Sequence, residues 1–156
     1  AFTVRAQVRG AYQRLFDERR VRKEYEATAP YDRALAFPRT VRSRIVKERG
    51  VLAAQQFPGA ANSETRIELL QVHGGLADYR LAPRTGKTHQ LRVHMNALGV
   101  PIVNDNFYPS FYDVAVDDYS APLQLLARSI AFVDPFSGVE RCFISKRQLS
   151  TGPSGE

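Results

Sequence analysis

Hydrophobic and polar positions change from a helical to an alternating pattern within the first 30 of the 156 residues of this chain. Apolar side chains recur at helical spacing over residues 11–19, which predicts an amphipathic helix. Residues 21–28 alternate instead, which predicts a strand with Lys23 and Tyr25 on the same side. A strand-like run at residues 2–4 precedes the helix. The first part of the chain is therefore expected to place a lysine beside a tyrosine on one strand face.

Alternating patterns return later in the chain and predict two hairpins. Their strands are expected at residues 65–72, 76–82, 123–133 and 139–145. Gly74-Gly75 and residues 134–138 supply the turn residues between them. Residues 31–64 predict loops with short strands, and residues 109–121 predict a loop. With about six strands against two helices, the pattern predicts an α+β fold with a mixed, mostly antiparallel sheet and few helices.

The segment Arg84–His94 runs from a predicted loop into the second helix. Thr88 is expected to cap that helix, and Gly99 to end it in the left-handed conformation. An apolar stripe at helical spacing continues the segment and consists of Leu91, Met95 and Leu98. Free backbone N–H groups at a helix start attract anions, and Lys87 adds a positive charge there. The segment therefore predicts an anion site, with phosphate as the natural candidate.

Composition narrows the classes of partner. The chain has 22 lysine and arginine residues against 16 acids, a net charge of +6 and a calculated pI near 9.8. The basic residues form two clusters, one of Arg14, Arg19, Arg20, Arg22 and Lys23 and another of Arg39, Arg42, Arg44, Lys47 and Arg49. Clustered positive charge is typical of nucleic-acid binding, although charge runs also occur as ordinary solvated surface.

Several classes of site are disfavoured. His89 and His94 are five residues apart, which is not the spacing of a helical zinc pair, and no metal or cofactor is expected. Position 81 is Leu81, so the segment before Lys87 lacks the first glycine of a phosphate-binding P-loop. No apolar run is long enough to span a bilayer. The one cysteine, Cys142, is expected to be a small buried residue, and its solitude fits a reducing cytoplasm.

Three segments resemble the RluA-type RNA pseudouridine synthase family. The most specific is Thr85–His94, continued by Leu98–Val103, Asp105 and Tyr108. The earlier segment Phe16–Ala27 is similar to the strand of that family that carries an active-site tyrosine. The third is a late hairpin, which follows in the same order and has a weaker likeness at Leu125–Ala127 and Phe132–Pro135. The resemblance extends over roughly residues 2–146.

This resemblance implies an enzyme that converts uridine in structured ribosomal or transfer RNA to pseudouridine without a cofactor or metal. The N-glycosidic bond breaks, the uracil rotates and the sugar is rejoined to carbon 5, after the base has left its stack. By the same resemblance Tyr25 packs on the uracil and Arg92 pairs with the catalytic aspartate. The residues that contact RNA would be Arg22, Lys23, Lys87, Thr88 and His89.

The resemblance also implies an incomplete catalytic domain. The catalytic aspartate of the family lies in a His-Arg-Leu-Asp-like segment before the strand at residues 2–4, so residues 1–149 are expected to be a C-terminal portion that is inactive alone. Residues 150–156 are expected to be a disordered tail. Asp17 and Asp105 do not have the required context, and Asp105 is expected to be structural. Lys87 and Leu126 replace an arginine and a histidine that are usual in the family.

Other interpretations stay open on the residues alone. Tyr25 is compatible with a core strand position, Arg92 with a surface helix position, and His89 and His94 with ordinary structural histidines. A non-catalytic RNA-binding module would use the same basic clusters with Tyr25 as a stacking platform. In either case the chain is expected to be a monomer. A structural domain with an incidental basic surface is the third alternative. The sequence does not identify the RNA or the uridine.

Overall fold

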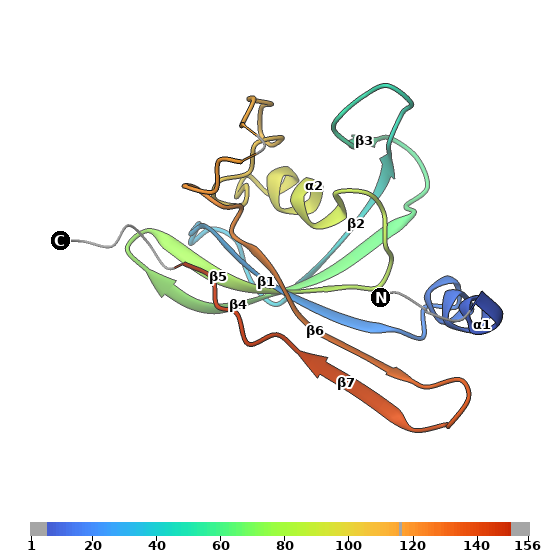
Figure 1. Ribbon diagram of the computed structural model, residues 1–156. Coiled ribbons are helices and arrows are strands. Elements are labelled where there is room, and N and C mark those ends of the chain that lie inside the picture. The colour runs from blue at the N-terminus through green and yellow to red at the C-terminus, as the bar shows by residue number, and fades with distance from the viewer. Residues whose placement is uncertain (1–5, 116, 151–156) are drawn as a thin grey trace.

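The computed structural model describes residues 6–115 and 117–150, which form one antiparallel sheet with two helices (Figure 1). The helices are α1 (Ala6–Asp17) and α2 (Gln90–Ala97), and the strands are β1 (Arg22–Pro30), β2 (Arg39–Val46), β3 (Gln55–Phe57), β4 (Ser63–His73), β5 (Leu76–Pro83), β6 (Leu125–Val133) and β7 (Glu140–Ile144). The strand order is β3-β2-β4-β5-β1-β6-β7, and every neighbouring pair is antiparallel. The predicted α+β class is confirmed.

Helix α2 covers one face of the sheet, and the core lies between them (Figure 1). Strand β5 shows why, because Ala77, Tyr79 and Leu81 alternate with polar residues and are fully buried. From the helix side, Leu91 and Met95 pack against this layer. The hydrophobic face of each strand therefore selects the side on which α2 docks.

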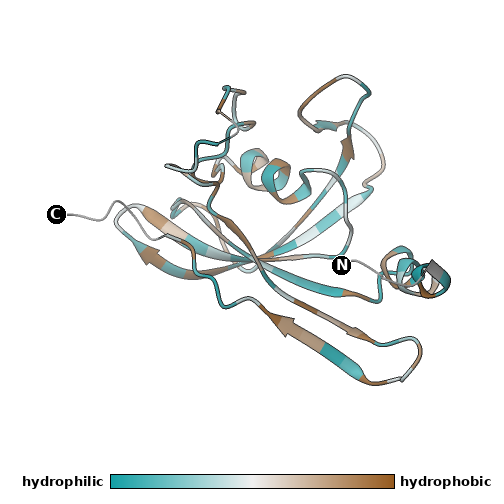
Figure 2. Ribbon diagram, viewed as in Figure 1, coloured by the Kyte–Doolittle hydropathy of each residue, from teal (hydrophilic) through white to brown (hydrophobic). Residues whose placement is uncertain are grey.

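The opposite face of the sheet carries charged residues, such as Arg66 on β4 and Arg80 on β5, which are exposed and alternate with buried ones. Figure 2 shows hydrophilic and hydrophobic residues along the same strands. Ion pairs line this face. Glu68 binds Arg66 of its own strand β4 and Arg80 of β5, and two further pairs between strands join Arg128 to Glu26 and Arg22 to Glu140. Ion pairs at the protein surface contribute little to stability, because solvent screens them. Their consequence here is that much of the positive charge on this face is neutralised locally.

Helix α1 docks on the β6–β7 hairpin through Tyr12. Its hydroxyl donates to Asp134 Oδ2 at 2.9 Å, and its ring packs against Phe132 and Phe136. Asp134 also accepts the backbone N–H groups of Phe136 and Ser137, which confirms the predicted turn. These bonds hold the pKa of Asp134 down to about 2.

Three expectations from the sequence need correction or lie outside the described residues. The interval 31–64 contains an eight-residue strand, β2, rather than mainly loops. Cys142 is exposed on β7 and is not a buried residue. The run at residues 2–4 and residues 151–156 are not part of the description. Neither helix that the structure describes is long and apolar enough to cross a membrane.

A buried polar network joins α2 to β2 and β4. The ring of His94 is fully buried, with Nε2 3.0 Å from Ser43 Oγ and 3.1 Å from Ser63 Oγ. Its Nδ1 lies 2.9 Å from Thr65 Oγ1. Burial lowers the pKa of His94 to about 4, so the ring is neutral at pH 7. His94 is therefore a structural histidine, one of the two alternatives left open by the sequence.

This histidine makes stability depend on pH. Its pKa is lower in the folded chain than the ordinary value of 6.5, so the unfolded chain takes up the proton first as the pH falls. The free energy of unfolding should therefore fall between about pH 6.5 and 4, by up to about 3 kcal/mol, and be fully retained above that window. Urea unfolding at a series of pH values measures the slope. In His94→Gln the slope should be shallower, and an equal slope in both proteins would contradict the assignment.

Candidate active site

The loop before α2 is held by the side chain of Gln90. Its Oε1 accepts the hydroxyl of Thr85 at 2.6 Å and the backbone N–H of Lys87 at 3.1 Å. Its Nε2 donates to Glu64 O and Thr65 Oγ1, both at 2.9 Å. Since Gln90 is 4% exposed, the loop is tied to β4 from inside the protein.

The N-terminus of α2 differs from the sequence prediction, because Thr88 does not cap it. His89 occupies the capping position in the left-handed conformation, with φ 54°, and makes no side-chain cap hydrogen bond. The other end is as predicted: Gly99 has φ 79°, and Gly99 and Val100 donate to Asn96 and Met95 in a Schellman motif.

His89 is held in this uncommon conformation by aromatic neighbours. Its Nδ1 lies 3.2 Å from Tyr108 Oη, and its ring meets Phe107 edge-on at 5.0 Å between centroids. Burial, followed by the nearby charge of Arg92, lowers the pKa of His89. A non-glycine residue in the left-handed region carries a conformational penalty of roughly 1–2 kcal/mol, and such penalties concentrate at functional sites.

A cavity of about 180 Å³ lies between β1, the loop and α2. Five of the side chains expected from the sequence line it together: Lys23, Tyr25, Lys87, His89 and Arg92. Apolar walls are supplied by Pro83, Leu91 and Leu125. The cavity is therefore cationic on one side and apolar on the other, which suits a planar polar ring attached to an anion.

Two of the expected RNA-contact residues are not brought to this cavity. Arg22 extends from the opposite face of β1, where it pairs with Glu140. Thr88 is exposed and is not among the residues that line the cavity.

Arg92 is fixed by Asp105. Its Nε donates to Asp105 Oδ2 at 2.8 Å, and Nη2 donates to Oδ1 of the same carboxylate. The Asp105 side chain is fully buried and also accepts the N–H groups of Phe107 and Tyr108. The guanidinium carbon stands 4.7 Å from the centre of the Phe107 ring. Arg92 thus has one edge occupied, whereas Nη1 has no bonded acceptor among the described residues.

Asp105 is structural, as expected from the sequence, but its pairing with Arg92 was not predicted. It lies 13 positions after Arg92, beyond the end of α2, so no helical spacing relates the two residues. The sequence feature that could have indicated this pairing is that Asp105 belongs to the same extended motif as Arg92. It holds Arg92, which lines the small cavity, rather than a remote part of the fold.

Lys23 and Tyr25 occupy the floor of the cavity as the alternation of β1 predicted. Lys23 Nζ donates to Thr85 O at 3.3 Å and has no carboxylate partner within the described ranges. Burial lowers the pKa of Lys23. The pairing of β1 with β6 shifts register between Glu24 and Tyr25, and such bulges frequently re-aim side chains beside active sites.

Comparisons with known proteins agree on one family. A family model described as RNA pseudouridylate synthase matches residues 1–97. The chain is 38% identical over 81 residues to the dual-specificity RNA pseudouridine synthase RluA of Vibrio cholerae, which covers 52% of this chain and 32% of that protein. Against the Haemophilus influenzae protein of the same name it is 32% identical over 109 residues, covering 70% of this chain and 43% of that protein.

The fold is also found in a solved structure. Human RNA Pseudouridylate Synthase Domain Containing 4 superposes with a TM-score of 0.64 at 24% identity, over 91% of this chain and 64% of that chain. In the two curated matches the chain spans less than half the length of the relative.

The Arg92–Asp105 pair generates a stability prediction. Asp105→Asn removes the charge that compensates a guanidinium only 12% exposed, so the free energy of unfolding should fall by about 3 kcal/mol. Arg92→Met in the same chain should recover part of that loss, because the unpaired charge is then gone. Urea unfolding of both single variants and the double variant measures the coupling. Strictly additive effects would contradict the pairing, and Asp117→Asn on the exposed loop is the matched control.

Proposed function

Because this chain belongs to the RNA pseudouridylate synthase family, we propose that its small cavity receives one uridine of a structured RNA for conversion to pseudouridine. The observation that carries the proposal is the convergence of Tyr25, Lys23 and Arg92 on a cavity of about 180 Å³. Pockets for drug-sized ligands measure about 300–1,000 Å³, so this one suits a single base that has left its stack.

The proposed reaction is balanced without a cofactor. The bond between N1 of uracil and C1′ of ribose breaks, a bond between C5 and C1′ forms, and the C5 proton is lost while N1 gains one. Substrate and product are isomers, so no oxidant or reductant is needed. Tyr25 packs on the uracil and acts in proton transfer at C5, within the range of side chains used for general acid–base catalysis.

Arg92 would orient the carboxylate that attacks at the sugar. Its Nε edge is occupied by Asp105, which leaves the Nη1 edge to bind a second carboxylate and keep it ionised. Asp105 itself is not the nucleophile in this proposal, because its carboxylate is fully buried and accepts four hydrogen bonds from Arg92, Phe107 and Tyr108.

The contact residues divide between base and backbone. Lys87 and Lys23 provide cations for a phosphate at the cavity rim, and His89 provides an aromatic ring beside Arg92. Arg22 and Thr88 contribute at most to binding outside the cavity. Ribosomal or transfer RNA in the cytoplasm is the proposed substrate, and the enzyme is proposed to act as a monomer.

No carboxylate lines the small cavity among the described residues. This observation favours a second candidate function for the 156 residues taken alone, a non-catalytic RNA-binding module.

Turnover separates the two candidates. RNA labelled with tritium at C5 of uridine releases its label on conversion, because the C5–H bond breaks. The 156-residue chain is expected to bind this RNA and release no tritium. A fusion of this chain to the part of the Vibrio cholerae protein that the chain does not match is expected to release tritium, because that part can supply a catalytic carboxylate. Release by the chain alone would contradict the proposed lack of a nucleophile.

A second prediction concerns Tyr25. Tyr25→Leu removes the ring on which the uracil packs, so affinity for a single-stranded oligouridylate should fall about tenfold, within the range for loss of one stacked base. Tyr25→Phe keeps the ring and should bind normally, yet it should slow tritium release by the active fusion. Fluorescence anisotropy measures binding. Equal affinity in the leucine and phenylalanine variants would refute the stacking role.

A further inference from the structure

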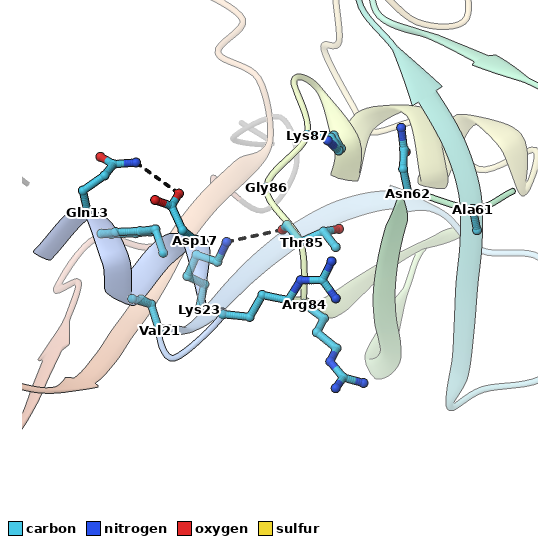
Figure 3. Close-up of a pocket in the computed structure, with 12 residues that line it drawn as sticks. Gln13, Asp17, Val21, Lys23, Ala61, Asn62, Arg84, Thr85, Gly86 and Lys87 are labelled. Atoms are coloured by element: carbon cyan, nitrogen blue, oxygen red, sulfur yellow. Dashed lines mark hydrogen bonds between the residues drawn. The ribbon is translucent and has the colours of Figure 1, made fainter. Parts of the chain in front are cut away.

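A second cavity, of about 620 Å³, adjoins the first (Figure 3). It lies between the C-terminal end of α1, the start of β1, residues 61–62 and the loop before α2. Its lining includes four cationic side chains, Arg19, Lys23, Arg84 and Lys87, against one carboxylate, that of Asp17. In Figure 3, Lys23, Arg84 and Lys87 come from two separate segments to border the same space.

The two cavities lie side by side. Lys23, Thr85, Gly86 and Lys87 line both of them, so the loop before α2 and Lys23 form a wall that the two cavities share. An RNA nucleotide is a base joined to a chain of phosphates. The arrangement therefore places an anion path directly beside the proposed base site.

The positive charge of the large cavity is largely uncompensated. Within the described part of the chain, Arg19, Lys23 and Lys87 form no ion pair, whereas Arg84 pairs with Glu64 at 3.7 Å. Asp17 accepts a hydrogen bond from Gln13 at 3.3 Å. On the outer face, by contrast, arginines pair with glutamates. Low acid content in a concave site raises the local concentration of anions.

Gly86 leaves open space at the junction of the cavities. Its backbone is not left-handed, so glycine is not required by conformation. A Cβ atom at this position would lie 3.5 Å from Lys23 Nζ, in ordinary contact, and would fill the space beside the ammonium group. The absence of a side chain therefore keeps the space next to Lys23 accessible.

Arg19 stands where a helix normally has glycine. Arg20 N donates to Leu15 O at 2.8 Å and Arg19 N to Phe16 O at 3.1 Å, the two bonds of a Schellman motif. Arg19 is the left-handed residue of that motif, with φ 57°. Glycine adopts this conformation without a steric penalty, whereas arginine does not. The position thus favours glycine for stability, yet it carries a cation into the cavity lining.

We propose that the large cavity binds the phosphodiester strand adjacent to the target uridine, with one phosphate beside Lys23 at Gly86 and the next beside Arg19. This subsite rests on the proposed function and extends it from one base to the flanking backbone. Its ligand class is single-stranded RNA rather than a free nucleotide.

The test compares two probes with the purified 156-residue chain: uridine 5′-monophosphate, followed by NMR titration, and a fluorescent oligouridylate, followed by anisotropy. Arg19→Gly should raise the Tm, weaken oligouridylate binding several-fold and leave monophosphate binding unchanged. The slope of log affinity against log salt should fall by about 0.7, the value for one phosphate contact to a single strand. Gly86→Ala should leave the Tm unchanged and lower the affinity for both probes.

Arg66→Ala is the matched control, since it removes one positive charge from the outer face of the sheet and should leave affinity for both probes unchanged. Unchanged oligouridylate affinity in both Arg19→Gly and Gly86→Ala would overturn the inference and leave the cavity to a polypeptide segment. A lowered Tm for Arg19→Gly would overturn the role of Arg19. If the wild-type chain binds neither probe, the proposed function fails as well, so the two failures are distinguishable.

Discussion

The need to satisfy buried polar side chains on α2 determines where the helix sits. Gln90 and His94 lie one helical turn apart on the face toward β2 and β4, and both are almost fully buried. The His94 ring bonds to Ser43, Ser63 and Thr65. The Gln90 amide bonds to Glu64, to Thr65 and to the loop before α2. If the helix shifted along its axis, these buried groups would lose their hydrogen-bond partners, at a free-energy cost of about 1–3 kcal/mol for each group. One position of α2 is therefore strongly preferred.

That position has consequences on the other helix faces. Leu91 and Met95 point into the core, while Arg92 lies on the side that reaches Asp105 and the cavity. Because the same Gln90 amide binds Thr85 and Lys87, the loop that separates the two cavities is fixed by the network that fixes the helix. The buried hydrogen bonds of Gln90 and His94 thus position both the loop and α2. Lys87 on the loop and Arg92 on α2 are thereby placed at the cavity.

The sequence predicted the elements whose two faces differ clearly. The hairpins and the Lys23–Tyr25 face follow from alternation, and the end of α2 follows from Gly99. The full length of strand β2 was not predicted, because its inward-facing residue Ser43 is polar. The burial of this serine is explained only by its hydrogen bond to His94, which the sequence does not reveal. The prediction that Thr88 caps α2 was wrong for a related reason. The buried Gln90 side chain forms the hydrogen bonds to the loop, and His89 occupies the capping position. Asp105 meets Arg92 only through the path of the chain after the helix.

Net charge was a weaker guide than the distribution of charge. Within the basic cluster at residues 39–49, Arg42 pairs with Glu64 and Arg44 donates to Pro58 O, so part of that cluster has local partners. The cations that border the cavities come instead from the end of α1, from β1 and from the loop before α2. A cation attracts a phosphate strongly only where no carboxylate already occupies it. The same surplus of positive charge thus has different meanings in the two places: the outer-face arginines described above are paired with glutamates, whereas Arg19, Lys23 and Lys87 border the two cavities without an ion-pair partner in the described part of the chain.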